Sequence, residues 1–170
     1  MVVYCYADGD FVGIWGQEKP QDTICAGNMT VFVVFFFNYL LLWFSKIQTD
    51  ITLLTLNYEY VALSHSVIDL LPLNNLSKEV IENLVTDSEN LKFVSSSNVY
   101  EDNNGVVIVK NPGINPTSKQ IAIRYYSFRQ HVRKKVLIRI TESGNQKAYI
   151  FTIVIQGELL VRNRKLIYGW

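Results

Sequence analysis

The sequence predicts an α/β domain with a mixed central sheet of about five strands flanked by helices. Short segments rich in valine and aromatic residues come early in the chain, and this composition favours strands. Segments with helically spaced apolar residues then alternate with further strand-like segments, which is typical of an α/β layer. The length of 170 residues and the apolar fraction of 49% fit one folded domain.

The first predicted element is a strand, Val2 to Tyr6, which runs into an acidic loop, Asp8 to Asp10. No basic segment followed by an apolar one opens the chain, so we expect no signal peptide and an intracellular protein, cytoplasmic or nuclear. The two cysteines lack the spacing of a zinc site or a disulfide framework.

An apolar block at residues 29–44 reads MTVFVVFFFNYLLLWF. A membrane-spanning helix needs roughly 20 apolar residues, and this block is shorter and carries Asn38 near its middle. Its β-branched and aromatic content favours strands. We interpret it as a buried hairpin, Val31 to Phe37 and Tyr39 to Ser45, with Asn38 in the turn. A membrane segment is the alternative, and we do not favour it.

Two helices are predicted next. Apolar residues recur at helical spacing from about Thr55 to Leu71, and Pro72 supplies a stop. A second helix begins at Ser77 as its N-cap and carries an apolar stripe as far as Val85. An extended segment from Leu91 to Tyr100 follows.

The remaining chain predicts a short helix at Gly105 to Val109, a helix at Gln120 to Val132 and a strand at Val136 to Ile140. We divide the chain into a domain at residues 1–155 and a basic and apolar tail at residues 156–170.

The net charge of +1 gives no overall attraction to nucleic acid. One stretch is nevertheless basic and contains no acid, with Lys119, Arg124, Arg129, Arg133, Lys134, Lys135 and Arg139. These side chains would contact phosphates if they shared a face. A solvated helix and strand explains the same pattern equally well.

Two acids, Asp8 and Asp102, follow predicted strands. Hydrolysis of a phosphodiester with two hard cations needs several converging carboxylates, because Mg²⁺ prefers oxygen ligands. Solvated turn residues are the alternative, since spacing along the chain does not establish convergence.

Six short motifs occur in the order of those in the ribonuclease H domain that follows the polymerase in copia-type retrotransposons. Residues 8–13 read DGDFVG, where that family has D-A-D-[WF]-A-G, and residues 43–48 read WFSKIQ, where it has W-x-S-K-x-Q. Residues 56–63 read LNYEYVAL against the last eight positions of S-T-x-A-E-Y-x-A-L, so the first half of this motif has drifted. Residues 102–106 read DNNGV against D-N-x-[SG]-A.

The last two motifs depart from the family at three positions, one in the first and two in the second. Residues 117–121 read TSKQI against T-x-K-H-I, so Gln120 replaces the histidine. Residues 146–153 read QKAYIFTI against Q-x-A-D-I-x-T-K, so Tyr149 replaces an acid and Ile153 a lysine. The chain thus resembles this family over roughly residues 4–153, as a degenerate copy.

The resemblance implies a ribonuclease H-like fold and hydrolysis of RNA in RNA/DNA hybrids. It implies that Asp8, Glu59 and Asp102 are catalytic and bind Mg²⁺, with two ions in the family and one position in doubt here. Weaker nucleic-acid contacts are expected at Gln48, Asn103, Lys119 and Arg124, and a structural role for each is the alternative.

Tyr149 is the main reason to expect impaired hydrolysis, because a neutral phenol is a poor Mg²⁺ ligand. The alternatives are a noncatalytic nucleic-acid-binding remnant, a small membrane-associated protein, and a translated genomic relic without a selected role. The sequence leaves the oligomeric state open.

Overall fold

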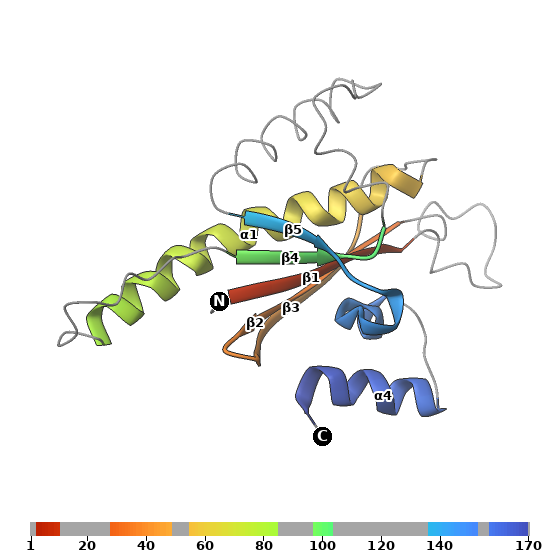
Figure 1. Ribbon diagram of the computed structural model, residues 1–170. Helices are drawn as coiled ribbons and strands as arrows, with labels where there is room; N and C mark the ends of the chain where they lie inside the picture. Colours follow the sequence, from red (N-terminus) through yellow and green to blue (C-terminus); the bar gives the residue numbers. More distant parts are fainter. Residues whose placement is uncertain are drawn as a thin grey trace.

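The computed structural model describes residues 3–10, 28–48, 55–84, 97–103, 136–152 and 157–169. One mixed sheet of five strands lies at its centre, in the order β3-β2-β1-β4-β5, with helices on both sides (Figure 1). The predicted fold class is therefore confirmed. The elements, in chain order, are β1 (Val3–Asp10), β2 (Met29–Phe36), β3 (Tyr39–Ile47), α1 (Thr55–Leu84), β4 (Ser97–Glu101), β5 (Val136–Ile140), the 3-10 helices η2 (Ser143–Asn145) and η3 (Lys147–Phe151), and α4 (Gly157–Tyr168).

Strand β1 occupies the middle of the sheet. It pairs antiparallel with β2 and parallel with β4, and β5 continues the parallel half. Successive side chains of a strand point to opposite faces, and both faces of β1 are covered: Cys5 and Ala7 pack in the core on the α1 side, whereas Tyr4 packs in a second core with η3 and α4. The alternation places Asp8 on the η3 face and Gly9 on the α1 face.

Helix α1 and the pair η3 and α4 lie on opposite sides of the sheet (Figure 1). The α1 core contains Leu63, Val67 and Leu70 of the helix, all of them buried. On the other side, Ala148 of η3 and Ile167 of α4 pack against Phe35. The sheet is therefore the middle layer, and its buried faces fix the positions of α1 and η3 relative to β1.

The first strand is longer than predicted. The sequence placed Asp8 and Asp10 in a loop, but β1 continues to Asp10 because β2 begins at Met29 and pairs with it there. Asp8 is consequently held in the ladder opposite Val31. A side chain at such a position has a fixed direction, which a loop would not impose.

The apolar block forms the predicted hairpin. Phe37 and Asn38 have φ values of 47° and 70°, and two residues with positive φ suit the tight turns that join antiparallel strands. Burial differs from the prediction, because β2 is buried whereas β3 is an edge strand that alternates between exposed and half-buried side chains. Among the described residues, no helix is long and apolar enough to cross a membrane.

The predicted stop at Pro72 is wrong. A single helix, α1, runs through Pro72 to Leu84. A proline inside a helix removes one hydrogen bond and crowds the preceding turn, but Leu70, Leu71, Leu73 and Ile81 all pack in the same core, so tertiary burial keeps the helix continuous. Ser77, predicted as an N-cap, instead donates to the Leu73 carbonyl at 2.6 Å within the helix. Val80, placed on the predicted apolar stripe, is exposed.

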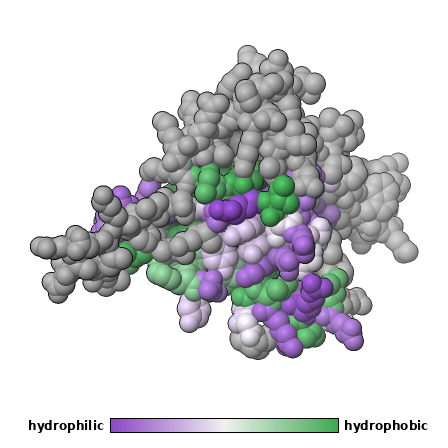
Figure 2. All heavy atoms as spheres, in the orientation of Figure 1, coloured by the Kyte–Doolittle hydropathy of each residue, from purple (hydrophilic) through white to green (hydrophobic). Residues whose placement is uncertain are grey.

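Strand β5 agrees with the prediction at Val136 to Ile140. The predicted helices at 105–109 and 120–132 lie outside the described residues, as does most of the predicted strand from Leu91. The segment predicted as a tail contains α4, whose surface mixes hydrophilic and hydrophobic residues (Figure 2). Ile167 anchors this helix to the sheet.

Candidate active site at the end of the central strand

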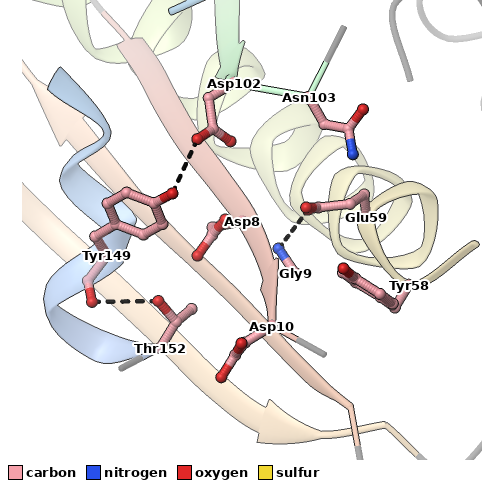
Figure 3. Close-up of a pocket in the computed structure, with 9 residues that line it drawn as sticks. All are labelled: Asp8, Gly9, Asp10, Tyr58, Glu59, Asp102, Asn103, Tyr149 and Thr152. Carbon is pink, nitrogen blue, oxygen red and sulfur yellow. Dashed lines mark hydrogen bonds between the residues drawn. The ribbon is translucent and has the colours of Figure 1, made fainter. Parts of the chain in front are cut away.

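A pocket of about 510 Å³ opens beside the end of β1. Figure 3 shows Asp8 in its middle, with η3 on one side and the beginning of α1 on the other. The pocket is lined by Asp8, Gly9, Asp10, Tyr58, Glu59, Asp102, Asn103, Tyr149 and Thr152. The three acids proposed from the sequence therefore meet in one place, although they come from three separate segments of the chain.

Each of the three acids is positioned by a different element. Asp8 is held by the β1 ladder, Glu59 lies near the beginning of α1, and Asp102 directly follows β4. Strands β1 and β4 are parallel, so their carboxyl ends lie at the same edge of the sheet. That edge is where open α/β sheets commonly place ligands.

Gly9 brings α1 into the site. Its N–H donates to Glu59 Oε2 at 2.7 Å, and a charged acceptor makes such a bond stronger than a neutral one. A Cβ at position 9 would lie 2.7 Å from Tyr58 Cδ2 and 3.0 Å from the backbone Cα of Glu59. The close approach of α1 to β1 therefore requires glycine at this position.

Tyr149 of η3 occupies the remaining side of the pocket. Its hydroxyl donates to Asp102 Oδ2 at 3.2 Å, and Thr152 Oγ1 donates to the Tyr149 carbonyl at 3.2 Å (Figure 3). Burial and the negative charge of Asp102 raise the pKa of Tyr149 to about 12. The phenol is therefore neutral at pH 7 and acts as a hydrogen-bond donor toward the acids.

The acids repel one another in a poorly solvated place. Burial, followed by the charge of Glu59, raises the pKa of Asp8 well above its usual range. Burial is also the main cause of the rise in the pKa of Glu59 to about 7, and the hydrogen bond from the Gly9 N–H acts against this rise. The charged forms are disfavoured in both cases, so a cation in the pocket would relieve the repulsion.

Glu101 is a further acid of the cluster that the sequence prediction missed. Its side chain is completely buried, Oε1 accepts from the Asn103 N–H at 3.4 Å, and Oε2 has no hydrogen-bond partner within the described part of the chain. Burial and then Glu59 raise its pKa. The available signal was the alternation of β4, which turns Glu101 to the same face as buried Val99.

The donor set suits a hard divalent cation in its chemistry, since it offers several carboxylate oxygens. In the arrangement seen, no three acid, histidine or cysteine side chains of the described residues are grouped to hold a metal ion. In this arrangement one oxygen of Glu59 accepts from the Gly9 N–H, and one oxygen of Asp102 accepts from the Tyr149 hydroxyl. On the η3 side of the pocket the nearest polar group is the neutral phenol of Tyr149, which is a poor ligand for such a cation.

The residues predicted to contact nucleic acid fall into three groups. Asn103 lines the pocket. Gln48 lies at the end of β3, where its Nε2 donates to Thr30 Oγ1 and to the Tyr58 carbonyl, both at 3.0 Å. It therefore joins the hairpin to α1. Lys119 and Arg124 lie outside the described residues.

Several solved structures share this architecture. LC11-RNase H1, solved in complex with an RNA/DNA hybrid, superposes with a TM-score of 0.54 over 88% of this chain and 92% of its own, at 11% identity. The N-terminal RNase H domain of Rv2228c from Mycobacterium tuberculosis gives 0.56 over 97% and 98%, at 13% identity. The fold is that of ribonuclease H.

A viral protein of known structure shares the fold over part of its length. The prototype foamy virus protease-reverse transcriptase matches 96% of this chain with 20% of its own length, at a TM-score of 0.51 and 14% identity. No protein-family profile matches the sequence. At these identities the likeness establishes the fold, whereas the chemistry depends on the residues of the pocket.

Proposed function

We propose that this chain is a ribonuclease H-like domain of copia-type descent whose ancestral reaction, metal-dependent hydrolysis of RNA in RNA/DNA hybrids, is impaired. The observation that carries the proposal is the meeting of Asp8, Glu59 and Asp102 in one pocket, with Tyr149 on its fourth side. The order of the six sequence motifs supports the copia-type descent. Intracellular localisation belongs to the same proposal.

Asp8, Glu59 and Asp102 would hold Mg²⁺ and receive the scissile phosphate of the RNA strand. When bound, Mg²⁺ activates water and stabilises the charge that develops on the phosphate. Asn103 follows β4 and lines the pocket, where its amide can donate hydrogen bonds to the hybrid. Contacts to 2′-hydroxyl groups distinguish RNA from DNA in such sites.

Tyr149 explains the impairment. It supplies no negative oxygen at neutral pH, and its hydroxyl engages Asp102, which is one of the remaining acids. A site that depends on two cations loses several kcal/mol of transition-state stabilisation when one is held poorly.

The test is cleavage of a labelled RNA/DNA hybrid by the purified chain in Mg²⁺, beside Tyr149→Asp. We expect very slow cleavage by the wild type and an increase of about 100-fold on restoring the acid. Tyr149→Phe is the matched control, because it frees Asp102 without adding a carboxylate, and it should not restore cleavage. Robust wild-type turnover that Tyr149→Asp leaves unchanged would contradict the proposal.

A noncatalytic hybrid-binding remnant is the second candidate. The hydrogen bond between Tyr149 and Asp102 favours it, because it engages an acid of the pocket without any metal ion. Binding of the hybrid by both the wild type and Tyr149→Asp, with cleavage by neither, would support this candidate over the first.

A further inference from the structure

Gln146 joins two segments that lie far apart in the sequence. Its side chain is completely buried, and its Nε2 donates to the carbonyl of Ala7, 139 residues away, at 2.7 Å. Its Oε1 accepts from the N–H of Ala148 at 3.3 Å. One amide therefore bonds to the backbone of β1 directly before Asp8 and to the first residues of η3.

The bond to Ala7 occurs where the strand ladder ends. On the β4 side of β1, the paired residues are Tyr4, Cys5 and Tyr6. A buried carbonyl without a partner costs free energy, and at Ala7 the Gln146 amide supplies the donor. At the position before Asp8, the side chain of Gln146 thus makes a hydrogen bond of the kind that a neighbouring strand makes elsewhere in the sheet.

The second bond fixes the beginning of η3, the element that carries Tyr149. Ala148 is completely buried, and the Lys147 ammonium lies 4.3 Å from the centre of the Phe35 ring. The burial of Ala148 and the cation–π contact of Lys147 both hold η3 against the sheet. Lys147 also lies 5.5 Å from the centre of the Tyr6 ring of β1, and Thr152, which directly follows η3, hydrogen-bonds to the Asp8 side chain. Of Gln146, Lys147 and Ala148, Gln146 is the residue whose side chain bonds to the backbone of β1, next to Asp8.

We propose that Gln146 is a positioning residue of the pocket: its two amide hydrogen bonds set where residue 149 stands relative to Asp8 and Asp102. The inference rests on the proposed function in one respect, since it assigns Gln146 a role in cation binding once an acid stands at position 149. The anchoring of η3 to β1 is separate from that function.

The experiment compares Gln146→Met with Asn163→Leu. Methionine keeps the length of the side chain and removes both hydrogen bonds. Asn163 is the matched control, because it is also a buried amide, and the hydrogen bond seen for it among the described residues stays within α4, to the Leu159 carbonyl at 2.9 Å. Two measurements are made: hydrogen–deuterium exchange of the full chain, and Mn²⁺ affinity by calorimetry in Tyr149→Asp with and without Gln146→Met.

We expect Gln146→Met to accelerate exchange at residues 146–152 about tenfold while the β2 amides keep their protection. It should weaken Mn²⁺ binding by Tyr149→Asp about tenfold as well. Asn163→Leu should change neither. Unchanged exchange in η3, or Mn²⁺ binding by Tyr149→Asp that stays equally tight when Gln146→Met is added, would overturn the proposal.

Failure of the proposed function gives a different result. Tyr149→Asp with intact Gln146 would then bind no Mn²⁺, and exchange in η3 would decide the role of Gln146 by itself. If Gln146→Met does not fold, Gln146→Asn replaces it, because asparagine keeps a buried amide but is one carbon too short to make both hydrogen bonds. Faster exchange confined to η3 supports the proposal, and unchanged exchange contradicts it.

Discussion

At Gly9, β1 and α1 lie so close together that a side chain would meet the helix. The family that the sequence resembles has alanine at this position of its first motif, yet a Cβ here would meet the backbone of Glu59 at 3.0 Å. In this chain the missing Cβ lets the Gly9 N–H reach the Glu59 carboxylate. The glycine therefore contributes to the geometry of the site, although it carries no chemistry of its own.

Gly9→Ala should reduce the free energy of unfolding by about 1–3 kcal/mol, because the added methyl group forces α1 to shift. Chemical denaturation measures the change. Gly144→Ala is the control, since its nearest neighbour is the flexible end of Arg162 at 3.2 Å, and it should stay within about 0.5 kcal/mol of the wild type. Equal stability of the two variants would contradict this account of Gly9.

At the scale of elements, the β2–β3 hairpin depends on its turn. Asn38 has a φ of 70°, a conformation that asparagine tolerates better than most residues. Its Oδ1 also accepts from the Tyr4 hydroxyl at 2.9 Å. The turn is therefore held to β1 as well as being shaped locally.

Asn38→Ala should destabilise the chain by about 1–3 kcal/mol, because alanine disfavours positive φ and the bond to Tyr4 is lost. Tyr4→Phe removes only that hydrogen bond and should cost about 0.5–1.5 kcal/mol. Thermal and chemical denaturation of both variants separate the two contributions. If Asn38→Ala costs no more than Tyr4→Phe, the backbone conformation contributes little.

The molecule as a whole holds several acids whose pKa is raised by folding. Asp8 and Glu101 have pKa values well above those of free carboxyl groups, and that of Glu59 is about 7. In the unfolded chain these carboxyl groups have pKa values near 4. At a pH between about 4 and the raised pKa values, the folded chain therefore binds more protons than the unfolded chain. The resulting stability is complete below the unfolded pKa and is lost as the pH rises through the folded pKa.

We therefore expect the free energy of unfolding in EDTA to be higher at pH 5 than at pH 8, by a few kcal/mol at most. Glu101→Gln should reduce this difference, because it removes one of the raised groups while keeping the volume. Chemical denaturation across this range tests both statements. A stability that rises from pH 5 to pH 8 would show that other groups dominate.

The sequence by itself determined the fold class, the two strands of the hairpin, strand β5 and the three acids of the pocket. Local pattern carries these features: β-branched and aromatic runs make strands, and short motifs mark where Asp8, Glu59 and Asp102 stand. The same motifs singled out Tyr149, and the structure places it beside Asp102.

Only the tertiary structure decided the features that depend on contacts between distant segments. Helix α1 passes Pro72 because residues on both sides of it are buried in one core. Glu101 joins the acids because the register of β4 buries it, and Gln146 reaches Ala7 across 139 residues. Local propensity is a weak term against burial and long-range hydrogen bonding, so these features follow from packing and not from any short stretch of sequence.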